Sequence, residues 1–101
     1  MEVKSATLRA GRLATFPDAV TARGARHCAE LERLARRGLP VAIVFVAQRG
    51  DVEAVAPEDA VDPAFGAALR GAAASGVRAL ACALTIAPGG VTRALRAPVR
   101  L

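Results

Sequence analysis

The sequence predicts an α/β protein in which helices flank a mixed β-sheet. Residues 39–47 and 77–86 are apolar runs with the length of buried strands. Two segments with helical spacing of apolar residues, ending near Arg37 and at Gly76, alternate with these runs along the chain. Such alternation is typical of one layered α/β domain, and a chain of 101 residues is long enough for one modest core.

The first elements are a predicted hairpin and a helix. Residues 2–8 alternate as in a strand, Ala10-Gly11 supplies a turn, and a second strand covers 12–16. Asp18 or Thr21 caps a helix that runs to about Arg37 and ends at Gly38. Its predicted buried stripe consists of Ala25, Cys28, Leu31 and Ala35.

The second half repeats strand and helix. Because residues 39–47 are apolar on both faces, we expect an interior strand covered by helices on each side. A polar connection through Pro57 leads to Asp62-Pro63, where an N-cap aspartate precedes proline at the first helical position. After the helix and the strand at 77–86, Pro88-Gly89-Gly90 turns the chain into a last strand or an extended tail. The predicted order is strand, strand, helix, strand, helix, strand, strand.

Charge is distributed unevenly along the chain. The net charge is +5, with +4 in residues 1–38, −3 in 39–76 and +4 in 77–101. Basic ends favour a polyanionic partner such as nucleic acid. Ordinary solvated arginines are the alternative.

Cysteine usage and hydropathy exclude several classes. Cys28 and Cys82 form no CxxC pair and the chain has one histidine, so zinc spacing and a disulfide framework are absent, and reduced core thiols are expected. The longest apolar run, Leu39 to Ala47, is about half of the roughly 20 residues that a membrane-spanning helix needs. We therefore expect a soluble cytoplasmic protein without a membrane partner.

The first candidate site is Glu2-Val3-Lys4. Residues two apart in a strand share a face, which places a carboxylate beside an ammonium. The carboxylate of Glu2 is a hard ligand for Mg²⁺, and Lys4 can polarise a water or stabilise charge on a phosphate. A surface ion pair is the structural alternative.

The second candidate site lies on the first helix. Arg23, His27 and Glu30 share one stripe that borders the buried face, near the helix start at Asp18 and Thr21. Such a half-buried row can bind a phosphate or support a metal site, or it can be a structural network tying the helix to the sheet.

Gln48 and Arg49 form a third candidate, since they stand where the central strand ends and such loops collect functional residues. Polar residues are also the usual end of a strand. No phosphate-loop or dinucleotide-binding glycine spacing occurs, which argues against nucleotide-dependent chemistry.

Taken together, these segments resemble the sugar fermentation stimulation protein family over essentially the whole chain. The resemblance rests on Glu-Val-Lys-Ser at 2–5, Phe-Pro-Asp-Ala-Val-Thr-Ala-Arg-Gly at 16–24, His27 and Glu30-Leu31. It continues in Val41 to Arg49, Asp62-Pro63 with Phe65, and Gly76-Val77.

The resemblance implies a DNA-binding protein with Mg²⁺-dependent DNA or RNA nuclease chemistry. Its C-terminal domain would be similar to the restriction-endonuclease-like PD-(D/E)xK fold, behind an oligonucleotide-binding-type barrel. Glu2 and Lys4 match the ExK half of that motif, with Glu2 as metal ligand and Lys4 assisting the water or the scissile phosphate. Arg23, His27 and Glu30 match a helix motif with a supporting or phosphate-contacting role.

One departure from the family pattern matters. The upstream metal-binding aspartate, its strand and the N-terminal barrel would all precede Met1, so residues 1–101 resemble a single, N-terminally incomplete nuclease-like domain. We therefore expect little or no nuclease activity from this chain alone, and whether it is an enzyme stays open. The alternatives are a non-catalytic nucleic-acid-binding regulatory module, or a truncated remnant without independent function. Besides nucleic acid, the expected partner is a second copy of the chain or the missing N-terminal half.

Overall fold

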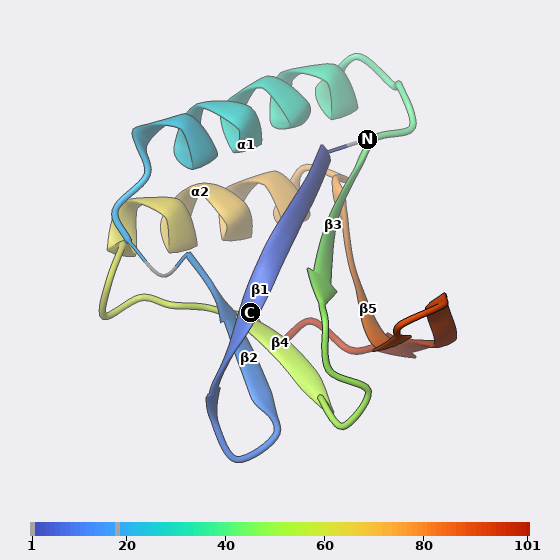
Figure 1. Ribbon diagram of the computed structural model, residues 1–101. Coiled ribbons are helices and arrows are strands. Elements are labelled where there is room, and N and C mark those ends of the chain that lie inside the picture. Colours follow the sequence, from blue (N-terminus) through green and yellow to red (C-terminus); the bar gives the residue numbers. More distant parts are fainter. Residues whose placement is uncertain (1, 18) are drawn as a thin grey trace.

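The computed structural model describes residues 2–17 and 19–101, without the side chains of Glu2 and of residues 8–10. It confirms a mixed α/β protein (Figure 1). The elements of the described chain, in order, are β1 (Glu2–Ala10), β2 (Leu13–Phe16), α1 (Ala22–Arg36), β3 (Ala42–Ala47), β4 (Ala54–Pro57), α2 (Pro63–Ala74), β5 (Arg78–Ala87) and β6 (Gly90–Ala97).

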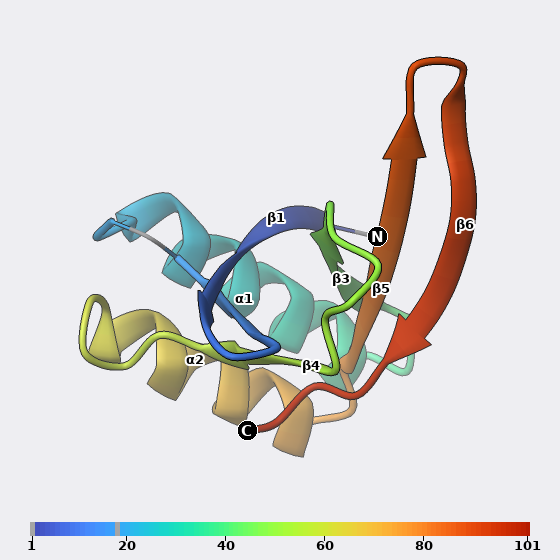
Figure 2. The ribbon, with the colours of Figure 1, turned by 60° about the horizontal axis from the view of Figure 1, so that its bottom comes forward.

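The strands form one sheet in the order β4-β2-β1-β3-β5-β6. Strand β1 belongs to two halves of this sheet: its residues 2–6 pair in parallel with β3, and its residues 7–10 pair antiparallel with β2. Strands β3 and β5 are parallel, as are β2 and β4, whereas β6 returns antiparallel to β5. Because β1 changes partners midway, the sheet bends along it, and its arc is visible in Figure 2.

The chain after β6 brings the two ends of the sheet together. Val99 forms a parallel bridge with Val55 of β4. The Val55 amide donates to the Pro98 carbonyl at 2.9 Å, and the Arg100 amide donates to the Val55 carbonyl at 2.8 Å. The sheet therefore curls, and its inner face contributes buried residues from both ends of the strand order, including Ala14, Val55 and Ala97.

Both helices pack against the same face of the sheet, side by side (Figure 1). Cys28 and Leu31 of α1 share one buried cluster with Phe65 and Leu69 of α2 and with Phe45 of β3. The expectation that helices cover β3 on each side is therefore wrong for the described chain. Apolar residues on both faces of a strand predict that both faces are covered, but they do not identify what covers each face.

Local sequence signals predicted the first elements correctly. The hairpin of β1 and β2 forms, with Gly11 at φ +55° in its turn. Thr21 is the N-cap of α1, its hydroxyl accepting from the Gly24 amide at 3.0 Å, and Gly38 at φ +84° follows the helix. Asp18, the alternative cap, lies outside the described residues.

The predicted polar connection through Pro57 contains a strand, and this is a correction. Strand β4 pairs with β2, and the Glu53 amide donates to the Arg12 carbonyl at 2.8 Å just before it. Ala54 and Val55 are both buried, so β4 lacks the alternation that marks a strand in sequence. At the C-terminal end, the open choice between strand and tail is settled as β6.

The two cysteines are not in disulfides and lie in different surroundings. Cys28 is buried in the core, as expected. Cys82 of β5 is partly exposed, on the face of the sheet that the helices do not cover, so the expectation of a core thiol is wrong for it. Within the described residues, no helix has the length and apolar character needed to cross a membrane.

Candidate functional site

Lys4 and His27 meet at the junction of the sheet and α1. Strand β1 directs Lys4 toward the helix, and its Nζ lies 3.0 Å from His27 Nδ1. An ammonium has donors only, so Nδ1 accepts and the ring proton of a neutral His27 stands on Nε2. Both side chains are half-buried. The fold thus brings together two sequence-predicted site residues that are 23 positions apart.

An aromatic cluster forms the floor beneath Lys4. The Nζ atom lies 5.9 Å from the centroid of the Phe16 ring. Phe16 in turn packs at 5.8 Å from Phe45 and 5.1 Å from Phe65, measured between ring centroids. The ammonium therefore has the apolar core on one side, where its charge is screened less than in bulk water and is attracted to the ring face.

Asp62 ties the first turns of the two helices together. Its carboxylate is 3% exposed and accepts from the Thr21 amide at 2.9 Å and from the Phe65 amide at 3.0 Å. The hydrogen bond from the Thr21 amide is the largest of the interactions that lower the pKa of Asp62. The sequence predicted Asp62 only as the N-cap of α2, because nothing in a spacing of 41 residues signals its contact with Thr21.

We expect Asp62→Asn to destabilise the domain at neutral pH and to reduce its acid sensitivity. One amide oxygen can replace only one of the two acceptors, and the NH₂ group would face a backbone N–H. Because the folded-state pKa of Asp62 is lowered, its stabilisation is present above the unfolded-state pKa and is lost as pH falls through the folded pKa. Thermal melts between pH 7 and pH 3 should show a midpoint lowered by about 5 °C at pH 7.

Asp59→Asn is the matched control for this prediction. The pKa of Asp59 is also lowered, chiefly by its hydrogen bond with Arg70, but this ion pair is exposed. Exposed pairs add little stability, so the control should melt close to the parent chain. Equal midpoints for the two variants at pH 7 would show that Asp62 does not link the helices.

The predicted half-buried row on α1 is only partly present. His27 is half-buried, but Arg23 and Glu30 are exposed. Instead, α1 carries an exposed series of basic side chains, Arg23, Arg26, Arg33 and Arg37, for which the described part of the chain provides no ion pair.

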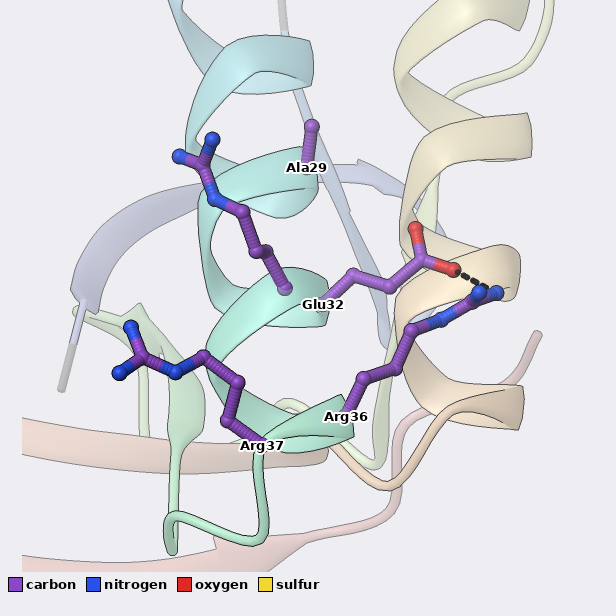
Figure 3. A pocket seen from close by; sticks show the side chains of 5 residues that line it. Ala29, Glu32, Arg36 and Arg37 are labelled. Carbon is purple, nitrogen blue, oxygen red and sulfur yellow. Dashed lines mark hydrogen bonds and ion pairs between the residues drawn. The ribbon is translucent and has the colours of Figure 1, made fainter.

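Arg36 is held differently from this series. It donates to Glu32 at 2.9 Å and to the Ser75 hydroxyl at 3.3 Å. Figure 3 shows Glu32 and Arg36 reaching toward α2, while Arg37 points away from it. A shallow depression lies among Ala29, Glu32, Arg33, Arg36 and Arg37. Among the described residues, the α1 series therefore presents unpaired cationic groups to solvent, whereas the exposed guanidinium of Arg36 is paired with Glu32.

Gln48 and Arg49 lie apart from Lys4. Together with Ser5 and Thr7 they line a depression on the face of the sheet that the helices leave open. Arg49 is engaged by Asp51 through two hydrogen bonds of 3.1 and 2.8 Å, and this contact is the chief cause of the lowered pKa of Asp51. The structure does not join this candidate to the Lys4 site.

The described residues do not by themselves fit a magnesium site. The side chain of Glu2 and all of Asp18 lie outside the description, and the remaining residues contain no group of three or more His, Cys, Asp or Glu side chains placed to hold a metal. The donors at Lys4 and His27 are nitrogens, and both oxygens of Asp62 already accept backbone N–H groups. Mg²⁺ requires oxygen ligands, so the set is incomplete.

Comparison with known sequences gives one consistent result. A family model described as "Sugar fermentation stimulation protein RE domain" matches residues 1–90. A sugar fermentation stimulation protein homolog of Geobacter metallireducens is 50% identical over 101 residues, covering 100% of this chain and 44% of that protein. A homolog of Thioalkalivibrio sulfidiphilus is 51% identical over 92 residues, covering 90% of this chain and 39% of that protein.

A solved structure of the same family has a similar fold. The SfsA protein of Pyrococcus furiosus, determined in complex with Ca²⁺, superimposes with a TM-score of 0.89 at 34% identity. The match covers 99% of this chain and 44% of the Pyrococcus chain. The chain thus spans about two fifths of the length of the proteins it matches.

Proposed function

Because the chain belongs to the sugar fermentation stimulation protein family, we propose that it is a nucleic-acid-binding, nuclease-like module of a longer family protein. One observation carries this proposal: the Lys4 ammonium is fixed by His27 at the helix that bears the exposed arginines. On this proposal, β1 and Lys4 belong to a PD-(D/E)xK-type core.

Binding would use the α1 series. Its four guanidinium groups can each donate to phosphate oxygens, and the ion pairs among the described residues do not involve them. Arg23 stands one helical turn before His27, so the series leads toward Lys4. A phosphate chain lying along α1 would therefore reach the ammonium.

Lys4 would act on the phosphate at the end of this path. Its Nζ lies 3.0 Å from His27 Nδ1, and its positive charge would stabilise an oxygen on which negative charge builds during phosphodiester cleavage. His27 is a positioning residue in this arrangement. The contact with His27 and the Phe16 ring beneath the ammonium would hold the charge in place before the reaction, so that little reorganisation is needed when charge develops.

A divalent cation belongs to this proposal, with Glu2 as one carboxylate ligand. The Ca²⁺ complex of the Pyrococcus relative supports divalent binding in the family. Its other ligands would have to come from outside the described residues. Such a cation would supply Lewis-acid activation of the phosphate.

A binding module without catalysis is the second candidate function. The incomplete set of oxygen ligands among the described residues favours it. Both candidates require the arginine surface, and they differ in what Lys4 does.

Fluorescence anisotropy with labelled duplex DNA, and with RNA of the same sequence, tests the binding shared by both candidates. For four phosphate contacts, the dissociation constant should rise about 100-fold between 50 and 200 mM salt. Arg26→Gln should weaken binding and reduce the salt slope by about one.

Arg36→Gln removes one charge from the same helix and serves as the control. Since Arg36 is already paired with Glu32, binding should change little. An affinity that does not change with salt concentration, or an equal loss of affinity in the two variants, would contradict a phosphate-binding role for the α1 series.

A further inference from the structure

The sheet has an open face that carries apolar side chains. The helices cover the face that contains Phe45 and Ala81, so the alternate residues of β1, β3 and β5 point to the other side. The register aligns Val3 with Val44 and Leu80, and Ser5 with Val46 and Cys82. We define the open face by its apolar members: Val3, Val44, Val46, Leu80, Cys82 and Leu84.

This composition does not suit a sheet face in water. Sheets with one solvated face alternate apolar and polar residues, whereas adjacent parallel strands such as β1, β3 and β5 are usually covered on both faces. Val3 is 55% exposed and the other five members are partly exposed, and no described helix lies over them. A contiguous apolar patch of this kind usually marks an interaction surface.

The relatives contain enough additional chain to cover it. The whole of this chain aligns with only 44% of the Geobacter metallireducens protein, and the Pyrococcus structure shows the same proportion. More than half of each family protein therefore lies outside the region that this chain matches.

We infer that the open face is the docking surface for that remaining part of a family protein. The inference rests on family membership and the geometry of the sheet, and it does not require nucleic-acid binding.

The rim of the open face indicates the chemistry of the docked part. Arg96 stands opposite Cys82 in the β5–β6 register, and Arg78 shares the side of Leu80. Both arginines are exposed. The docked part should therefore present an apolar layer with acidic groups at its edge. A second copy of this chain, with net charge +5, would place like charges against this rim.

Cys82 provides a direct probe, because it belongs to the open face while Cys28 is buried in the core. The experiment compares maleimide labelling of this chain with labelling of a fusion protein, in which this chain replaces the aligned region of the Geobacter metallireducens homolog. Peptide mapping assigns the labelled cysteine. Cys82 should react in the isolated chain, and its labelling rate in the fusion should be lower by about tenfold or more. Cys28 should react slowly in both proteins.

Paired substitutions test whether contact with the open face causes the protection. Val3→Asp in the fusion should restore Cys82 labelling, whereas Val20→Asp, at an exposed position before α1, should leave it protected. If the fusion does not fold, a cysteine at the aligned position of the intact Geobacter homolog gives the same readout.

Two results would overturn the inference. One is equal labelling of Cys82 in the isolated chain and in the longer protein. The other is protection in the isolated chain that rises with its concentration alongside dimer formation in ultracentrifugation, since a second copy would then be the occupant.

Discussion

Phe65→Ala is expected to leave the domain largely unfolded at moderate temperature. Phe65 is fully buried in the first turn of α2, with ring centroids 5.1 Å from Phe16 and 6.5 Å from Phe45. Truncating a buried phenylalanine costs about 3–5 kcal/mol, because the transfer free energy is lost and a cavity remains. Total stabilities are about 5–15 kcal/mol, and a chain of this length belongs to the lower part of that range.

The cavity would open where four elements meet, so it cannot collapse easily. A Cβ placed on Gly24 would lie 3.0 Å from the Phe65 ring, which shows how closely α1 approaches α2 there. The same ring touches Phe16 of β2 and Phe45 of β3. Closing the space would require a backbone shift in a helix or in the sheet, and the cost should therefore lie toward the upper end of the range.

Urea denaturation followed by circular dichroism measures this cost. Phe65→Leu retains most of the side-chain volume, so its free energy of unfolding should fall much less than that of Phe65→Ala. Val20→Ala, at an exposed position, should leave the free energy of unfolding nearly unchanged. If Phe65→Ala lost less than about 1 kcal/mol, the aromatic cluster would not be the centre of the core.

Local chemistry explains which elements the sequence could predict. Thr21 caps α1 through its own hydroxyl, and Asp62-Pro63 begins α2 through a cap and a fixed proline φ. Each of these signals involves residues only a few positions apart, so it can be recognised from the sequence alone.

The missed features depend on long-range partners. Strand β4 is stabilised by β2 and by the segment after β6, which is more than 40 residues away along the chain. The same holds for the contact of Asp62 with Thr21 and for the placement of both helices on one face of the sheet. In the candidate site, spacing placed Lys4 and His27 on suitable faces of β1 and α1, but only the packing of α1 on the sheet sets them 3.0 Å apart.

On the proposed nuclease function, Lys4→Met should abolish nucleic-acid cleavage by a longer family protein that contains this chain, while leaving most of its binding. Methionine keeps an unbranched stem against Phe16 and removes the ammonium, so it separates the charge from the packing. Loss of a preorganised charge at a developing oxyanion costs roughly 100-fold or more in rate. Binding depends mainly on the α1 series and should change by about threefold or less.

Single-turnover cleavage of labelled DNA and RNA with Mg²⁺, using the fusion to the Geobacter homolog, measures this loss, and anisotropy measures binding in parallel. Lys4→Arg is the informative companion: it keeps a positive charge but replaces a compact ammonium with a longer, planar guanidinium, whose donors would take different positions beside His27. We expect it to retain binding and to lose most of the cleavage.

The outcomes separate the candidate functions. Cleavage by Lys4→Met at the parent rate would show that Lys4 is structural, and absence of cleavage by the parent fusion would favour the non-catalytic module. The 101-residue chain alone should show little or no cleavage, because its described residues do not complete a set of oxygen ligands for a cation. If that chain cleaved DNA in a Lys4-dependent manner, Glu2 would have to act with ligands from this chain itself, and the requirement for the remaining part of the family protein would be wrong.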